Sequence, residues 1–281
     1  MLAAGASPVL ARDPAPRSHG AGRATAAPGP ASLPQDTAKR LKSGDAGQIK
    51  GALDDVRAAG RNGAAAVPVI AELLRGGLSP VLTEAALETL AATESPAATN
   101  VVALYLRHRN TELRRTAARA LTKTGGPDAA KALRLALSDS DAQVRGIAAT
   151  ALGGMKARDA VEDLFVALDH KVPEAASSLG ALCADAECIR LAGKLGSVSF
   201  DVVTTGLDGV LMRPPAEIND DLKIEIVGRL RELGTAEAHH FLKGVQARLP
   251  AKGSARVKKA VDQAVLATAK SPGRDGSEAA E

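Results

Sequence analysis

The sequence predicts an all-α protein, an α-solenoid of stacked antiparallel helix pairs with a period of about 31 residues. Composition is the first observation: 45% of the residues are hydrophobic but only 1% are aromatic, so the apolar content is mostly Ala, Leu and Val. Such a mixture favours helices over strands, where β-branched and aromatic residues are enriched. An internal repeat and a set of helix stop signals are the other two observations.

The internal repeat appears when the chain is aligned with itself at a shift of 31 residues. Within each unit the apolar residues recur at i, i+4 and i+8, twice in succession, which is typical of two amphipathic helices. One such pair cannot bury its own apolar stripes, so neighbouring units must stack to cover them. The aligned columns are Leu82/Leu113/Val144, Leu90/Leu121/Leu152, Ala98/Ala129/Ala160, Val102/Leu133/Leu164 and Leu106/Leu137/Leu168, with Ala86/Ala117/Ala148 midway between the first two.

Helix boundaries are marked independently of these columns. Ser140 and Asp141 offer an N-cap for a helix from residue 142, and Gly153-Gly154 offers a left-handed stop. Gly125-Gly126-Pro127 ends one helix and starts the next, one unit earlier. The repeat and its boundary signals therefore predict the same helices.

Less regular copies flank the three clear units. Upstream, residues 48–59 and 64–74 are expected to be helical. Downstream, we expect helices at 173–182, 186–195, 200–211, 222–233, 236–249 and 255–269. The solenoid is thus predicted over residues 46–269, with a disordered tail at 270–281.

The segment Asp141-Ala-Gln-Val-Arg-Gly-Ile-Ala-Ala-Thr-Ala-Leu-Gly153 resembles the second helix of a HEAT repeat, in particular the short HEAT-like kind of phycobilisome lyase subunits. The unit is shorter than the roughly 40–47 residues usual for HEAT repeats, so HEAT-like is the closer description. The resemblance implies polar residues that link adjacent repeats by hydrogen bonds. The matching positions are Asn110/Arg114, Asp141/Arg145 and Asn219/Lys223.

The N-terminal segment precedes the repeats and differs from them in composition. Residues 1–11 are small and apolar and end in Val-Leu-Ala, which resembles a signal-peptidase site and the remnant of a signal peptide. They contain no positively charged n-region. Residues 12–45 are rich in Pro, Gly and Ala and are expected to form a disordered linker. Exported or periplasmic localisation is favoured over cytoplasmic, and no run approaches the roughly 20 apolar residues of a membrane span.

Cys183 and Cys188 flank Ala-Asp-Ala-Glu in a predicted turn between two helices. In an exported protein they would form a disulfide, whereas in a reducing cytosol they would remain structural thiols. The sequence leaves both alternatives open. A metal site is not expected because no second half of a four-ligand set is present.

A cluster of positive charge lies within the repeats. Arg115, Arg119 and Lys123 follow i, i+4, i+8 spacing and are expected to share an exposed helix face. With Arg107 and Arg109 they could form a partner surface for an anionic molecule. We favour the alternative of an ordinary solvated face.

The net charge of +4 comes from the ends of the chain, because residues 46–242 contain 22 Lys or Arg and 25 Asp or Glu. A phosphate-binding surface needs its positive charge on the folded body, so nucleic acid is an improbable partner. No glycine-rich phosphate loop, GxSxG motif or spaced His ligand pair occurs, and we expect no catalytic, cofactor-binding or metal-binding residues. The sequence therefore predicts a non-catalytic scaffold that binds another protein. One alternative is an accessory or lyase-type subunit that handles a cofactor or pigment, and a second is a nucleic-acid binder.

Overall fold

The computed structural model describes residues 33–250 and 253–269. The elements follow one another as α1 (Gln35–Leu41), α2 (Ala46–Ala59), η1 (Gly60–Ala66), α3 (Val67–Gly76), α4 (Pro80–Ala92), η2 (Pro96–Ala98), α5 (Thr99–Leu104), η3 (Tyr105–Arg107), α6 (Thr111–Thr124), α7 (Gly126–Ala136), α8 (Ala142–Gly154), η4 (Arg158–Ala160), α9 (Val161–Asp169), α10 (Glu174–Leu182), α11 (Asp185–Ala192), α12 (Phe200–Met212), α13 (Asp220–Leu233), α14 (Ala236–Arg248) and α15 (Ala255–Ala269), where η marks a 3₁₀-helix. The described residues form no strand beyond one isolated bridge between Leu195 and Val198. The predicted all-α fold is confirmed.

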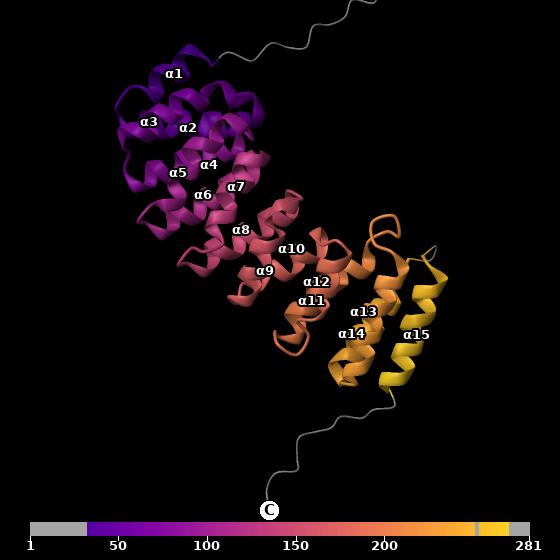
Figure 1. The fold of residues 1–281 in the computed structure, drawn as a ribbon. Helices are drawn as coiled ribbons and strands as arrows, with labels where there is room; N and C mark the ends of the chain where they lie inside the picture. The colour runs from indigo at the N-terminus through magenta and orange to yellow at the C-terminus, as the bar shows by residue number, and fades with distance from the viewer. Residues whose placement is uncertain (1–32, 251–252, 270–281) are drawn as a thin grey trace, which may run out of the picture.

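The helices stack along one axis, as Figure 1 shows from indigo to yellow. One inner row consists of α2, α4, α6, α8, α10 and α12, each of which packs on the next. The outer helices α3, α5, α7, α9 and α11 each pack beside the inner helix that follows them in the chain. At the C-terminal end α13, α14 and α15 pack on one another and close the stack (Figure 1). The predicted solenoid is confirmed, and none of its described helices is long and apolar enough to cross a membrane.

The apolar columns of the repeat form the core. Leu121, Leu133 and Leu152 are fully buried, and the Ala column at 86, 117 and 148 is buried with them. Leu106 is the exception, since it is only partly buried. The reason is local: α5 tightens into η3 at Tyr105, which changes the rotation per residue and turns Leu106 out of the apolar stripe.

The solenoid begins earlier than expected. Residues 35–41, which the composition placed in the disordered linker 12–45, form α1 and pack against α2. Leu41 is fully buried there, and Arg40 forms an ion pair with Asp55 at 2.5 Å. One buried leucine and one ion pair anchor this short helix in a Pro- and Ala-rich context. The predicted signal-peptide remnant 1–11, the linker up to residue 32 and the tail 270–281 lie outside the described residues.

Glycine allows three inner helices to approach closely. A Cβ atom at Gly180 would collide with the backbone of Gly206, and one at Gly206 would collide with the Ala176 carbonyl, so α10 and α12 touch backbone to backbone. A Cβ at Gly153 would likewise collide with Ser178, whose hydroxyl donates to the Ala149 carbonyl at 2.8 Å. The surface of α8, α10 and α12 is consequently depressed and lined by small side chains.

Candidate functional site

The arginine cluster does not form one surface. Arg114 donates from Nε and Nη2 to the carboxylate of Asp139 at 2.8 and 2.9 Å, and these side chains are only 12% and 10% exposed. Arg115 donates to both oxygens of Asp141 at 2.8 and 2.6 Å and also contacts Glu112. Arg114 and Arg115 of α6 therefore hold the loop before α8, and the expectation that Arg115 belongs to a free exposed face is wrong.

These ion pairs shift the ionisation of their members. Hydrogen bonds from Arg115 lower the pKa of Asp141 to about 2, against an ordinary value of 3.8. The partners Arg114 and Arg115 have raised pKa values because the acids Asp139 and Asp141 accept their hydrogen bonds. All four groups are charged at neutral pH, so the pairs act as fixed links between successive repeats.

The remaining cationic residues lie on two different sides of the stack. Arg119 and Lys123 are exposed on α6, in the inner row. Arg107 lies at the end of η3 in the outer row, and Arg109 follows in the loop to α6. The structure thus separates the five predicted surface residues into the partly buried link at Arg115, an inner pair and an outer pair.

Not all residues of the implied inter-repeat pairs link one repeat to the next, as the HEAT-like pattern implied. Asn110 caps α6 through the Glu112 amide at 2.9 Å, while Arg114 binds Asp139 of the following repeat. Asp141 caps α8 through the Val144 amide, but Arg145 donates only to the carbonyls of Asp139 and Ser140 in its own loop. The links between repeats therefore come from Arg114 and Asp141, and Arg145 stabilises a single loop.

The third pair occupies the turn before α13. Asn219 caps that helix through the Leu222 amide at 2.8 Å and donates to Asp185 of the preceding repeat at 2.7 Å. Lys223 is buried and donates to the Arg213 carbonyl. Burial lowers the pKa of Lys223. Asn219 links neighbouring repeats, whereas Lys223 fastens the α12–α13 loop.

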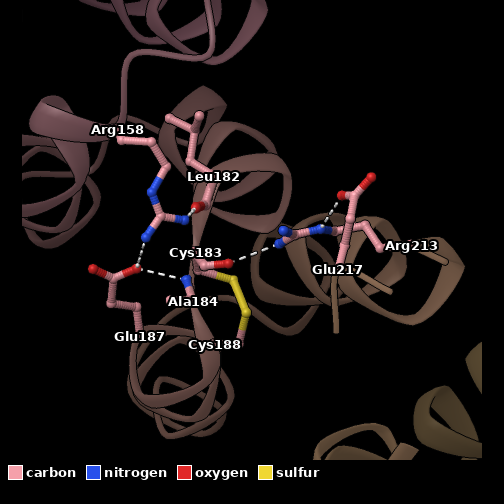
Figure 2. Close-up of a disulfide and its surroundings, with 8 residues drawn as sticks. All are labelled: Arg158, Leu182, Cys183, Ala184, Glu187, Cys188, Arg213 and Glu217. Atoms are coloured by element: carbon pink, nitrogen blue, oxygen red, sulfur yellow. Dashed lines mark hydrogen bonds and ion pairs between the residues drawn. A yellow bond between two sulfur atoms is a disulfide. The ribbon is translucent and has the colours of Figure 1, made fainter. Parts of the chain in front are cut away.

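Cys183 and Cys188 form a disulfide, with a Cα–Cα distance of 5.2 Å, and both residues are buried. Figure 2 shows that the bridged turn is held from two sides. Arg213 donates to the Cys183 carbonyl at 2.7 Å, and Arg158 donates to the Leu182 carbonyl. Because both sulfurs are bonded and covered, this turn is a structural anchor between the α8–α9 and α12–α13 connections.

A groove crosses the inner row from α6 to α12. It consists of two open cavities, of about 560 and 650 Å³, which share Thr150 and Glu174. Small side chains predominate along it. The lining residues are Arg119, Thr122, Lys123, Gln143, Gly146, Ile147, Thr150, Ala151, Gly153, Gly154, Pro173, Glu174, Ser177, Ser178, Ala181, Asp201, Val202 and Thr205.

The groove carries opposite charges at its two ends. Lys123 and Arg119 lie at the α6 end, and Asp201 lies on α12 at the other. Glu174 stands between them, so close to Gly146 that a Cβ atom there would collide with its carboxylate. Within residues 33–250 and 253–269, neither Glu174 nor Asp201 has an ion-pair partner, whereas acids elsewhere pair across helices, as Glu88 does with Arg57.

This groove was not predicted from the sequence. Its signal was present as small residues at outward positions, since Thr150 and Ala181 are exposed and lie one repeat period apart. Gly146, by contrast, is buried beneath Glu174. The described part of the chain holds no group of three or more His, Cys, Asp or Glu side chains that could bind a metal ion. The open groove with its small side chains is suited to non-covalent binding.

A family model of HEAT repeats matches residues 67–142. A comparison with curated proteins gives no match. The complex of CpcE and CpcF of phycocyanin lyase from Nostoc sp. PCC7120 is a similar solved structure, with 18% identity, 88% of this chain and 99% of that chain covered, and a TM-score of 0.44. The designed armadillo repeat protein YIII(Dq)4CqI is also similar, with 17% identity, 83% and 98% covered, and a TM-score of 0.41.

The matched residues run from the start of α3 to the first residue of α8. They include the first two of the three units in which the apolar columns recur, and the residues that form the Arg114–Asp139 and Arg115–Asp141 links. The inner row continues on both sides of this segment. The protein is therefore an all-α solenoid, and its residues 67–142 match the model of HEAT repeats.

Proposed function

We propose that this protein is a non-catalytic scaffold, and that it binds an extended segment of a partner protein in the groove across α6, α8, α10 and α12. The supporting observation is the continuity of that groove, whose two cavities share Thr150 and Glu174. A continuous channel over four helices fits a linear segment better than a small molecule, which proteins usually enclose in a single deeper pocket.

The dimensions of the groove set the length of the segment. Packed helices lie about 8–10 Å apart, so three steps from α6 to α12 span about 24–30 Å. An extended chain rises about 3.3 Å per residue, which corresponds to about eight residues. The glycines and small side chains of the groove allow a peptide backbone to approach closely. Hydroxyl groups of Thr150 and Ser177 lie in position to accept or donate hydrogen bonds to it.

The unpaired charges give the segment a direction. Lys123 and Arg119 attract an acidic residue at the α6 end, while Glu174 and Asp201 attract a basic residue toward the α12 end. Exposed charges of this kind contribute more to orientation and association rate than to affinity. We therefore expect a partner segment with opposite charges at its two ends.

Blocking the groove at Thr150 tests this proposal. Thr150→Trp fills the position that both cavities share, and Glu237→Trp on α14 is the matched control because that residue is exposed and distant from the groove. Each variant is immobilised as the full chain, and the proteins retained from an extract of the source cells are quantified by mass spectrometry. We expect one near-stoichiometric partner that the unchanged protein and the control retain and Thr150→Trp loses.

Equal retention by all three proteins would contradict the proposed groove. A coloured ligand that copurifies with the unchanged protein but not with Thr150→Trp would instead favour the subunit that handles a cofactor or pigment. Retention of nucleic acid that falls steeply with salt would favour the nucleic-acid binder.

A further inference from the structure

A second groove lies on the outer row of helices, away from the inner groove. One cavity of about 290 Å³ lies between α3 and α5, and another of about 360 Å³ lies between α5 and α7. The two meet at Leu104, which lines both. Their walls are largely aliphatic, with Leu78 in the first cavity and Leu135 in the second.

The apolar residues at this groove recur with the repeat. Leu104 is 67% exposed and Leu135, one period of 31 residues later, is 65% exposed. Val166 follows after another period and is 54% exposed. Single exposed leucines are common on protein surfaces, but a stripe that repeats in register beside two cavities marks an interaction surface. The buried apolar columns of the repeat do not include these positions.

The free charge of this groove is positive. Arg75 and Arg107 line it and are exposed, and neither has an ion-pair partner in the described part of the chain. The one acid in the lining, Asp139, is already bound by two hydrogen bonds from Arg114.

Farther along the outer row, cations are neutralised by acids on neighbouring helices. Arg134 pairs with Asp163, and Arg190 pairs with Glu162. The outer groove is therefore the part of this row that combines aliphatic surface with unneutralised arginine, which is complementary to a ligand with aliphatic and carboxylate groups.

We propose that the outer groove binds an acidic amphipathic helix of a partner protein. Stacked helices lie about 8–10 Å apart, and residues seven positions apart on a helix are separated by about 10.5 Å along its axis. Aliphatic side chains at i and i+7 of a helix laid across α5 and α7 thus reach Leu104 and Leu135. Carboxylates beside that apolar stripe reach Arg75 and Arg107. Because the inner groove belongs to the other row, the protein binds two partners at once.

The first test uses synthetic helical peptides and the full-length chain. The probe carries leucines at seven-residue spacing with glutamates on either side, and its binding is followed by fluorescence anisotropy. One control peptide has lysine in place of every glutamate, and another has serine in place of every leucine. We expect the acidic amphipathic probe to bind about tenfold more tightly than either control. Equal affinity for the three peptides, or no saturable binding of the probe, overturns the proposal.

The second test places the probe on the groove. Leu135→Ser and Arg107→Glu change exposed side chains, so circular dichroism should show an unchanged fold. Each should weaken probe binding about fivefold, as expected for contacts near the centre of an interface. Arg119→Glu in the inner groove is the matched control and should leave the affinity unchanged. If Arg119→Glu weakens probe binding and Leu135→Ser leaves it unchanged, the assignment to the outer groove is overturned. That result would not contradict the proposed function of the inner groove.

Two other occupants are distinguished by parallel measurements. Vesicles that contain phosphatidylserine test whether the arginines bind a membrane surface instead. Vesicle binding that Arg107→Glu abolishes, together with no binding of the probe, overturns the proposal in favour of a membrane surface. Analytical ultracentrifugation of the protein alone measures its oligomeric state and so tests whether a second copy of the chain occupies the groove. Self-association that Leu135→Ser abolishes likewise overturns it, whereas a monomer that binds the acidic probe supports it.

Discussion

Asp141 accepts two hydrogen bonds from Arg115 of α6, the preceding helix of the inner row, at 2.8 and 2.6 Å, while the same carboxylate accepts the Val144 amide at 3.0 Å. One side chain therefore caps α8 and fastens it to α6. Both contacts favour the ionised form, the Arg115 hydrogen bonds most of all, and the pKa of Asp141 falls to about 2. The cap and the link between repeats depend on the same negative charge.

Asp141→Asn should lower stability at neutral pH but not at acidic pH. The pKa of Asp141 is lower in the folded chain than the ordinary 3.8, so its stabilisation is complete above about pH 4 and is lost as the pH falls toward about 2. Asparagine keeps a side-chain oxygen that can cap α8, so the difference in stability between the two proteins reports the effect of the charge. Thermal unfolding followed by circular dichroism should show melting temperatures that differ at pH 7 and converge near pH 2. A difference that stays constant across this range would contradict the ion-pair explanation.

Reduction of the Cys183–Cys188 disulfide should destabilise the protein moderately. The bridge closes a loop of only a few residues, since the cysteines are five positions apart. For so small a loop the loss of chain entropy amounts to about 2 kcal/mol. Urea unfolding with and without reductant measures the change, and the Cys183→Ala/Cys188→Ala variant should not respond to reductant. Two labelled thiols per chain in protein made under oxidising conditions would contradict the bridge itself.

Leu121→Ala should be strongly destabilising. Leu121 is fully buried between repeats, and truncation of a buried leucine costs about 2–5 kcal/mol. Leu104→Ala is the matched control, because that leucine is largely exposed and its loss should change the free energy of unfolding by less than about 0.5 kcal/mol. Urea denaturation of both variants provides the comparison. Similar effects of the two substitutions would mean that the apolar stripes are wrongly assigned.

Gly180→Ala and Gly228→Ala should change stability in opposite directions. The added methyl at Gly180 meets the Gly206 backbone, so α10 and α12 must separate, at a cost of about 1–3 kcal/mol. Gly228 lies within α13 with open space at its Cβ position, and alanine there should stabilise the helix by up to about 1 kcal/mol. Chemical denaturation distinguishes the two results. A neutral Gly180→Ala would show that the close approach of α10 and α12 is not required.

Short-range features of the sequence correctly predicted the helices and their buried faces. The columns at a shift of 31 residues identified Leu121, Leu133 and Leu152 as core residues, and all three are fully buried. The N-cap at Asp141 was also visible, because a cap needs only a polar side chain before the first turn. Where local geometry changes within a helix, as at Leu106, the regular period no longer predicts burial.

Only the tertiary structure decided which outward residues are free. On an isolated helix Arg115, Arg119 and Lys123 share one face, but the loop before α8 lies over Arg115 and brings Asp141 to it. Gly146 lies at the equivalent position one repeat later and is covered by Glu174 instead. Periodicity along one helix determines the side that faces the core. What covers the other side depends on the neighbouring repeat and on how closely the backbones pack, so both grooves emerge only from the assembled stack.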